Sequence, residues 1–341
     1  MSGRTTAVTI IASGAIVTMV AALAAQVRSA PIAASPVSSV PANPPDLHGT
    51  WSFATVTPLQ RPEGVTKEFL TSDEIAEIER KAIIAATDEA RGATPQADVA
   101  GAYNDFWWDR GTRVAGRRTG LISDPPDGRL PPLTPTAKAF ADSQEAANIV
   151  ARRNGDLPPR GPEDTDLWDR CLTRGIPIVP GPYNINIQII QTATHVVIHH
   201  EMIHDARVVP IVPAGTPRPA VRADFKPWFG VSRGHWEGET LVVETTHISD
   251  RQELPFAPRM SAGTMRLTER FSRTPHGTLR YEFTVDDPTI YTQPWTAVLE
   301  MPPSDGEIYE YACHEGNHAM EGILRGARQR DPAPALTTSR P

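Results

Sequence analysis

The sequence predicts a mainly β protein, either an antiparallel barrel or a strongly curved sheet, with two helices in the N-terminal half and one near the C-terminus. The first observation is a series of short β-branched segments, separated by turn signals such as Glu237-Gly238-Glu239. The second is apolar–polar alternation along them, which places every second side chain on one face. Links of hairpin length favour antiparallel neighbours. We expect strands over residues 184–192, 195–204, 207–212, 227–232, 240–246, 265–273, 279–287, 295–301 and 307–313.

The first 24 residues predict a cleaved export signal. Arg4 gives a positive start, residues 7–25 form an apolar run, and Ala22-Leu23-Ala24 has the small-x-small pattern of a cleavage site. An uncleaved membrane anchor is the alternative, because the apolar run approaches the length that spans a bilayer. The polar residues 26–29 favour cleavage, so we expect an exported protein, periplasmic or secreted, with no membrane contact after cleavage.

The rest of the chain reads as one domain between flexible ends. Residues 25–45, rich in Pro, Ala and Ser, are expected to form a disordered leader, and residues 329–341 a disordered tail. Residues 46–328 then form a single barrel-like domain with a helical insertion at about 71–153. The formal net charge of −7 argues against nucleic acid and anionic membrane surfaces as partners. We expect a small-molecule ligand or substrate instead.

Three helices have sequence signals at their ends. Thr71, with Glu74 three residues later, forms a capping box. Thr134, followed by a proline at the first helical position, begins a second helix that runs to about residue 153. Asn317 has the position of a cap before a final helix.

The two cysteines, Cys171 and Cys313, are expected to form a disulfide. An isolated pair in an oxidising compartment is more often bridged than free. The bridge would tie a central loop to the C-terminal strand. The alternative is a pair of buried thiols that pack as small apolar groups.

Two long motifs resemble the hallmarks of a large, uncharacterised family of exported bacterial proteins. Residues 236–245 read WEGETLVVET, and residues 311–317 read YACHEGN. The resemblance extends over residues 46–328 and implies a shared fold without a catalytic mechanism. One departure is His318, where the family more often has an aromatic residue. The Gly-x-Trp sequence at residues 49–51 is also similar to the start of lipocalin-like barrels, so we expect the barrel to be lipocalin-like.

Two pentads, residues 200–204 and 314–318, spell the zinc-protease signature HExxH. The signature works on a helix, where side chains four residues apart lie within roughly 6 Å on one face. In a strand the same residues lie about 13 Å apart, too far to share an ion. We interpret the first pentad as strand and the second as a strand end leading into a helix cap. Neither is then expected to be a zinc-protease site.

Strand alternation also predicts carboxylates inside the sheet. Glu269 shares a face with Leu267 and Phe271, so it should point inward, and Asp287 ends the inward series of its strand. In the last expected strand, residues 307–313, Glu310 lies two residues after Ile308 and so shares its inward face. A buried carboxylate without a partner is costly, so these groups need cations.

Arg207 and Arg266 are the candidate partners of these carboxylates. One interpretation is that these carboxylates form ion pairs that only fill the interior of the barrel. The other is a ligand cavity that contains a carboxyl group of raised pKa beside a histidine, the pairing that proton transfer requires.

We therefore predict an exported enzyme for acid–base chemistry of the isomerase, lyase or hydratase type, without a cofactor. His204 and Glu269 would exchange protons, and Arg207 would stabilise negative charge. His314 and Glu315 would complete or orient the site.

Tyr291 and Trp295 would form an aromatic wall of the ligand site, with Asp287 and Glu310 as further ligand-binding residues. Packing at the rim of the barrel is the simpler interpretation of either aromatic side chain.

Two other functions remain open. One is a non-catalytic protein that binds a small apolar or aromatic ligand; paired carboxylates and outward-pointing histidines would favour it. The other is a metal-dependent hydrolase, with zinc held by His204, His314 and His318 together with a carboxylate.

Overall fold

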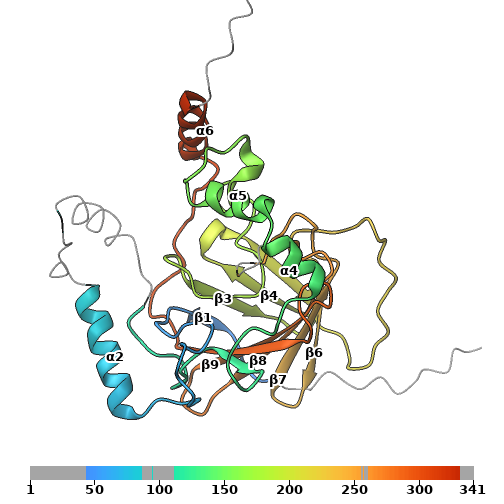
Figure 1. Ribbon diagram of the computed structural model, residues 1–341. Helices are drawn as coiled ribbons and strands as arrows, with labels where there is room; N and C mark the ends of the chain where they lie inside the picture. The colour runs from blue at the N-terminus through green and yellow to red at the C-terminus, as the bar shows by residue number, and fades with distance from the viewer. Residues whose placement is uncertain (1–43, 87–93, 95–110, 255, 257–259, 331–341) are drawn as a thin grey trace, which may run out of the picture. The chain divides into compact units, whose positions relative to one another are not determined.

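The computed structural model describes residues 44–86, 94, 111–254, 256 and 260–330 (Figure 1). All of them belong to the larger of two units of the chain, residues 39–341. The expected signal and nearly all of the expected leader and tail lie outside the described residues. Within the described ranges, no helix combines the length and apolar character needed to cross a membrane.

The described strands form two antiparallel sheets, which agrees with the expected mainly β class. The smaller sheet has the order β1-β3-β4-β5, and the larger has the order β2-β10-β9-β8-β7-β6. Figure 1 shows β7, β8 and β9 side by side in the larger sheet. The bounds are β1 Gly49–Ser52, β2 Ile122–Asp124, β3 Asn186–Gln191, β4 His195–His200, β5 Ala206–Pro210, β6 Val231–Glu237, β7 Thr240–Thr246, β8 Arg266–Arg273, β9 Leu279–Asp286 and β10 Trp295–Met301.

The two sheets touch at both margins without closing into a barrel among the described strands. Trp51 of β1 forms an isolated bridge with Pro303, just beyond β10. On the other side, Ile211 forms a parallel bridge with Gly234 of β6, and the Val212 N–H donates to the Gly234 carbonyl at 2.9 Å. Of the two expected arrangements, a barrel or a strongly curved sheet, the described strands do not form a closed barrel; they form two sheets joined at single bridges.

The contact at the β1 margin is short. The Ser52 N–H donates to the Pro302 carbonyl at 3.0 Å, and the Ser304 N–H donates to the Thr50 carbonyl at 2.9 Å. Pro303, which lies between them, has no N–H to donate to a longer ladder.

The core lies between the sheets and follows the expected alternation. In β9, Tyr281 and Phe283 are 0% and 2% exposed, and the next inward residue beyond the strand, Asp287, is 1% exposed. Ring centroids are 4.9 Å apart for Phe271 and Tyr281, and 5.6 Å apart for Phe283 and Trp295. Aromatic pairs of this kind each contribute about 0.5–1.5 kcal/mol beyond their burial.

The helix signals are confirmed, with one correction. In α2, Ser72–Ala85, the Glu74 carboxylate accepts from the Thr71 N–H at 2.9 Å, and the Thr71 hydroxyl accepts from the Glu74 N–H at 3.3 Å. The helix expected from Thr134 to residue 153 is instead two helices, α4 Pro135–Ala141 and α5 Gln144–Arg153. Ser143 separates them because its hydroxyl accepts from an N–H in the first turn of α5 and so caps a new helix.

The C-terminal helix begins directly after Asn317, as the sequence predicts. Asn317 accepts from the Met320 N–H at 3.2 Å through its side-chain oxygen, and α6 spans His318–Arg330. The helix therefore includes residues 329 and 330, which the sequence predicts to belong to the tail.

Two expected strands are wrong. Residues 307–313 have no strand structure, because the Tyr309 N–H donates to the Glu201 carboxylate at 3.3 Å rather than to a neighbouring strand. Residues 227–230 form a turn, in which the Pro227 carbonyl accepts from the Gly230 N–H at 2.9 Å. The strand that follows, β6, starts only at Val231.

The expected disulfide is present. Cys171 and Cys313 are bonded, with Cα atoms 5.7 Å apart and a separation of 142 residues in sequence. Because residues 307–313 are not a strand, the bond joins two loops instead of a loop and a strand.

Replacing both cysteines by alanine should lower the free energy of unfolding by about 2–5 kcal/mol, because the bond restricts the unfolded chain over a long loop. Urea titrations of the oxidised protein and of the Cys171→Ala/Cys313→Ala variant measure the difference. Dithiothreitol should shift the wild-type midpoint towards that of the variant and leave the variant unchanged. Equal midpoints for the two oxidised proteins would contradict a stabilising role.

Candidate functional site

The first HExxH pentad is a tight turn between two strands. β4 ends at His200, and a 3₁₀ turn, η2 Met202–His204, leads directly into β5. Ile203 and His204 have φ of 66° and 59°, in the left-handed region that neither a helix nor a strand uses. The strand expected to reach His204 therefore stops four residues earlier. His200 is buried and His204 is exposed, so the two imidazoles do not share a face.

The second pentad is split by the start of α6. His314 and Glu315 lie in an exposed turn, and His318 is the first residue of the helix. Across the described ranges, no three His, Cys, Asp or Glu side chains are grouped to hold a metal ion. The expected alternative zinc ligands His204, His314 and His318 thus form no such group.

The predicted interior carboxylate of Glu269 is present and paired with Arg207. The two nitrogens of the Arg207 fork lie 2.5 and 2.8 Å from the two Glu269 oxygens. Arg207 is 3% exposed and Glu269 is 0% exposed. This bidentate geometry gives two charge-assisted hydrogen bonds in a buried environment.

Tyr281 completes the partners of the buried pair. Its hydroxyl donates to a Glu269 oxygen at 2.8 Å and accepts from the Ile178 N–H at 3.1 Å. Burial, together with the Glu269 charge, raises the pKa of Tyr281, so the phenol stays protonated and serves as a donor. The Glu269 carboxylate therefore accepts three hydrogen bonds, which offset the cost of burying it.

Only two of the five expected catalytic residues come together. Arg207 and Glu269 form the buried pair, whereas His204, His314 and Glu315 are exposed residues of turns. Glu269 is bonded to its partners and sealed from solvent, so a substrate cannot reach its carboxylate.

The expected ligand-binding carboxylates are also apart. Asp287 is buried, and its oxygens accept from the Thr264 hydroxyl at 3.0 Å and the Thr289 hydroxyl at 2.7 Å. Glu310 is exposed. Asp287 thus holds a turn together, and Glu310 lies outside the core.

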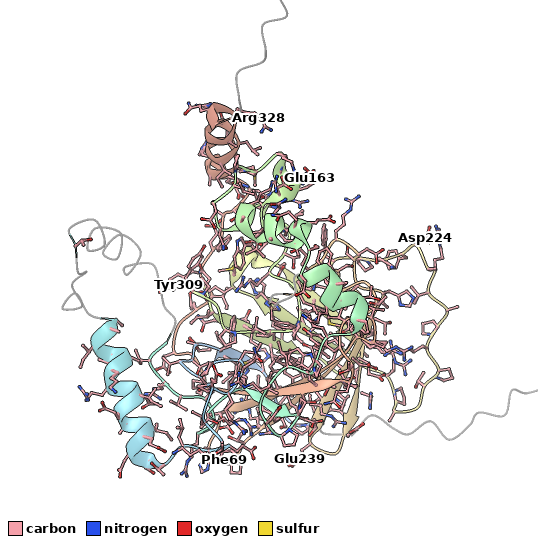
Figure 2. All side chains as sticks on the ribbon, in the orientation of Figure 1. Phe69, Glu163, Asp224, Glu239, Tyr309 and Arg328 are labelled. Carbon is pink, nitrogen blue, oxygen red and sulfur yellow. A yellow bond between two sulfur atoms is a disulfide. The ribbon has the colours of Figure 1, made fainter. Side chains whose placement is uncertain are left out.

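Strand alternation did not predict that Glu201 is buried. A strand through residue 204 would have turned this side chain away from His200, but both are 2% exposed. One Glu201 oxygen accepts from the Asn186 side-chain amide at 2.8 Å, and the other from the Tyr309 N–H at 3.3 Å. Figure 2 labels Tyr309, which is 71% exposed although its backbone is held. No local pattern signals this long-range contact.

His200 and Asp205 flank the pair and have shifted pKa values. Burial, helped by the charge of Arg207, lowers the pKa of His200 to about 3, so the ring is neutral. Among the described residues, its Nε2 atom has no hydrogen-bond partner. Burial raises the pKa of Asp205 to about 6, although Thr173 and the Arg174 backbone partly oppose the shift. Sequence reasoning assigned no role to either residue.

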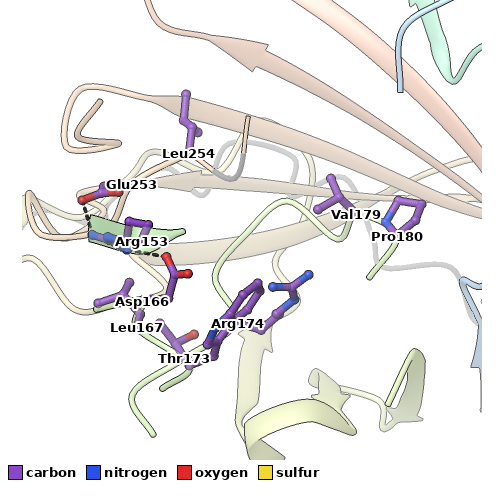
Figure 3. Close-up of a pocket in the computed structure, with 10 residues that line it drawn as sticks. Arg153, Asp166, Leu167, Thr173, Arg174, Val179, Pro180, Glu253 and Leu254 are labelled. Atoms are coloured by element: carbon purple, nitrogen blue, oxygen red, sulfur yellow. Dashed lines mark hydrogen bonds and ion pairs between the residues drawn. The ribbon is translucent and has the colours of Figure 1, made fainter. Parts of the chain in front are cut away.

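A small pocket of about 130 Å³ lies beside the segment that contains Thr173 and Arg174 (Figure 3). Arg153 forms ion pairs with Asp166 and with Glu253, the latter at 2.7 Å. The Arg174 guanidinium lies 3.9 Å from the centroid of the Trp168 ring. The pocket is too small for a drug-sized ligand, and most of its charges bind one another.

A polar hollow of about 720 Å³ lies over β7 and β8. Arg218 on its rim pairs with Glu244 at 3.1 Å, and Lys226 pairs with Asp250 at 2.6 Å. Both pairs are partly exposed, so water competes for these groups.

A third pocket, which we call the α5 pocket, is apolar and has a volume of about 670 Å³. Its size is in the usual range for small-molecule sites. The lining residues are Leu59, Gln60, Leu130, Pro131, Leu133, Ala141, Ala146, Ala147, Val150, Ala151, Asp156, Phe256 and Tyr291.

The two residues of the expected aromatic wall, Tyr291 and Trp295, take different places at this pocket. Tyr291 lines it. Trp295 is fully buried behind the lining, with its ring centroid 6.1 Å from that of Tyr291 and 5.0 Å from that of Phe256.

Comparison with known proteins gives no match to a protein-family model, to a curated protein or to a solved structure.

Removing one partner of the buried pair should be far more costly than removing both. Arg207→Met should lower the free energy of unfolding by about 3–5 kcal/mol, because it leaves a buried carboxylate unpaired, and Arg207→Met/Glu269→Leu should recover part of that loss. Arg270→Met is the matched control, since Arg270 pairs with Glu237 at 2.9 Å on the surface; it should cost less than about 1 kcal/mol. Urea unfolding measures all three. A double variant less stable than Arg207→Met would contradict this.

His200 should make folding sensitive to acid. Below pH 6.5 the unfolded chain binds a proton at His200, whereas the folded protein binds it only near its lowered pKa of about 3. Wild type should therefore lose stability relative to His200→Gln as the pH falls from about 6 to 4, by roughly 1.4 kcal/mol per pH unit. Urea titrations at several pH values measure the difference.

Asp205→Asn is the control with the opposite sign. A carboxyl whose folded pKa is raised to about 6 favours folding at low pH, and this contribution is lost as the pH rises through about 6. For the His200 prediction, the contradicting result would be a free energy of unfolding that changes with pH in the same way in wild type and in His200→Gln.

Proposed function

We propose that this protein binds a small apolar or aromatic molecule in the α5 pocket. The observation that carries the proposal is the pocket itself, a space of about 670 Å³ with a lining that is mostly aliphatic and aromatic. Burial of a ligand against such a lining is favoured by roughly 25 cal/mol per Å² of apolar surface removed from water. A few polar groups in the wall would orient the ligand.

The state of the charged residues supports binding over acid–base catalysis. The carboxylates of Glu269 and Asp287 are both hydrogen-bonded within the protein. His204 and His314 are exposed, and neither is among the described residues that line the α5 pocket. An isomerase, lyase or hydratase would need a proton donor or acceptor within hydrogen-bond reach of its substrate. Of the described residues that line the pocket, only Asp156 and Tyr291 have ionisable side chains; Asp156 is exposed, and burial raises the pKa of Tyr291, so that its phenol keeps its proton.

We propose further that binding takes place outside the cytoplasm. The Cys171–Cys313 disulfide supports an oxidising compartment, and the signal-type sequence of residues 1–24 supports export. A periplasmic or secreted protein of this kind would store, carry or sense its ligand.

Filling the pocket should weaken binding. The neutral fluorescent probe N-phenyl-1-naphthylamine should bind wild type with increased emission, and Ala151→Phe should weaken its affinity at least about tenfold by occupying the space. Ala76→Phe makes the same change on α2, away from the pocket, and should bind like wild type. Fluorescence titration measures the affinities.

Two results would contradict the proposal. One is the absence of saturable emission with wild type. The other is equal affinity of Ala151→Phe and Ala76→Phe, which would place the probe elsewhere. Circular dichroism of both variants establishes that they are folded.

A further inference from the structure

Asp156 is the only charged residue among the described residues that line the α5 pocket. The other lining residues are aliphatic, aromatic or uncharged and polar, so no described lysine, arginine or histidine lines the space. Asp156 is exposed, so water and a bound molecule can both reach it. Its side chain forms no hydrogen bond or ion pair with any residue in the part of the chain that the structure describes. The apolar pocket therefore has one accessible carboxylate without a partner.

The backbone after α5 holds Asp156 against the pocket. The Asp156 N–H donates to the Ala151 carbonyl at 2.8 Å, and Ala151 itself lines the pocket. The Leu157 N–H donates to the same carbonyl at 3.1 Å, so both residues are fixed at the end of the helix. The oxygens of an aspartate side chain lie less than about 4 Å from its own Cα atom. The negative charge therefore stays at the edge of the pocket in every rotamer of the side chain.

The two arginines nearest to Asp156 in sequence are bound elsewhere. Arg152 pairs with Asp164 at 3.3 Å, and Arg153 forms its ion pairs with Asp166 and Glu253. Neither arginine therefore neutralises the Asp156 carboxylate. Part of the surroundings of this carboxylate is apolar lining rather than water, so it attracts a cation more strongly than two charges attract each other in bulk water.

We propose that the ligand of the α5 pocket is a mainly apolar molecule with one protonated amino group, which forms an ion pair with the Asp156 carboxylate. This inference rests on the proposed function, because it assigns a ligand class to the same pocket. The hydrocarbon part of the ligand would contact aliphatic side chains such as Val150, which is 45% exposed. The ammonium group would stay at the exposed edge of the pocket and keep part of its hydration. Asp156 would repel a carboxylate of the same size.

Three naphthalenes with side groups of similar size test the proposal. 2-(Aminomethyl)naphthalene is a cation at neutral pH, 2-naphthoate is an anion, and 2-ethylnaphthalene is uncharged. Each compound is titrated as a competitor of the probe N-phenyl-1-naphthylamine. The proteins are wild type, Asp156→Asn and Asp305→Asn. Asp156→Asn keeps the shape of the side chain and removes its charge. Asp305→Asn is the matched control, because Asp305 is an exposed aspartate that is not among the lining residues.

Wild type should bind the amine at least about fourfold more tightly than the carboxylate. Asp156→Asn should weaken binding of the amine by about two- to fivefold, the effect of one partly exposed ion pair, and should tighten binding of 2-naphthoate by a similar factor. 2-Ethylnaphthalene should bind all three proteins equally, because it has no charge to interact with the carboxylate. Asp305→Asn should behave like wild type. An unchanged ratio of the amine and carboxylate affinities in Asp156→Asn, or an equal change of that ratio in Asp305→Asn, would overturn the inference.

Salt gives a second readout, which a merely structural role of Asp156 would not change. Raising the NaCl concentration from about 0.05 M to about 0.5 M should reduce the preference of wild type for the amine, because ions screen an exposed charge. The same change should have little effect on Asp156→Asn, and equal salt dependence of the two proteins would overturn the inference.

The two proposals fail differently. Displacement of the probe by 2-ethylnaphthalene, without a preference of wild type for the amine over the carboxylate, would leave the pocket function intact and overturn the inference. Failure of all three compounds to displace the probe would remove both.

Discussion

The buried ion pair between Arg207 and Glu269 constrains the rest of the structure. A charge at this depth must be paired and hydrogen-bonded, so the sheet that contributes Arg207 must lie opposite the sheet that contributes Glu269. Tyr281 adds its hydroxyl to the carboxylate and also accepts the Ile178 N–H, which holds a loop over the same place. The pair thus links both sheets and one connecting segment. The positive charge of Arg207 also helps to keep His200 neutral, because it adds to the lowering of the His200 pKa by burial.

The α5 pocket depends on that core indirectly. Phe271, Tyr281, Phe283 and Trp295 form a continuous aromatic series from the ion pair to the back of the pocket wall. Trp295 in turn packs edge to face against Tyr291, with ring centroids 6.1 Å apart. The interior therefore separates two kinds of polar group. The carboxylate of Glu269 is satisfied within the protein, whereas the buried Tyr291 hydroxyl and the buried Trp295 indole N–H find no acceptor among the described residues.

Local and alternating signals predicted much of the fold. The capping box of Thr71 and the Asn317 cap involve neighbours in sequence, and the burial of Glu269 follows from parity along one strand. The site was less predictable. The left-handed conformation of Ile203 ends a strand that β-branched composition would have continued. The lining of the α5 pocket comes from several distant segments, and no pattern in one segment shows which others it meets.

The disulfide also determines how the folded protein responds to tension. The loop it closes, between Cys171 and Cys313, contains every strand from β3 to β10. A pull applied to the two ends of the chain passes across the sulfur–sulfur bond and bypasses that loop. These strands are thus shielded from stretching, and of the described elements only β1, β2 and the helices on either side of the loop can be drawn out.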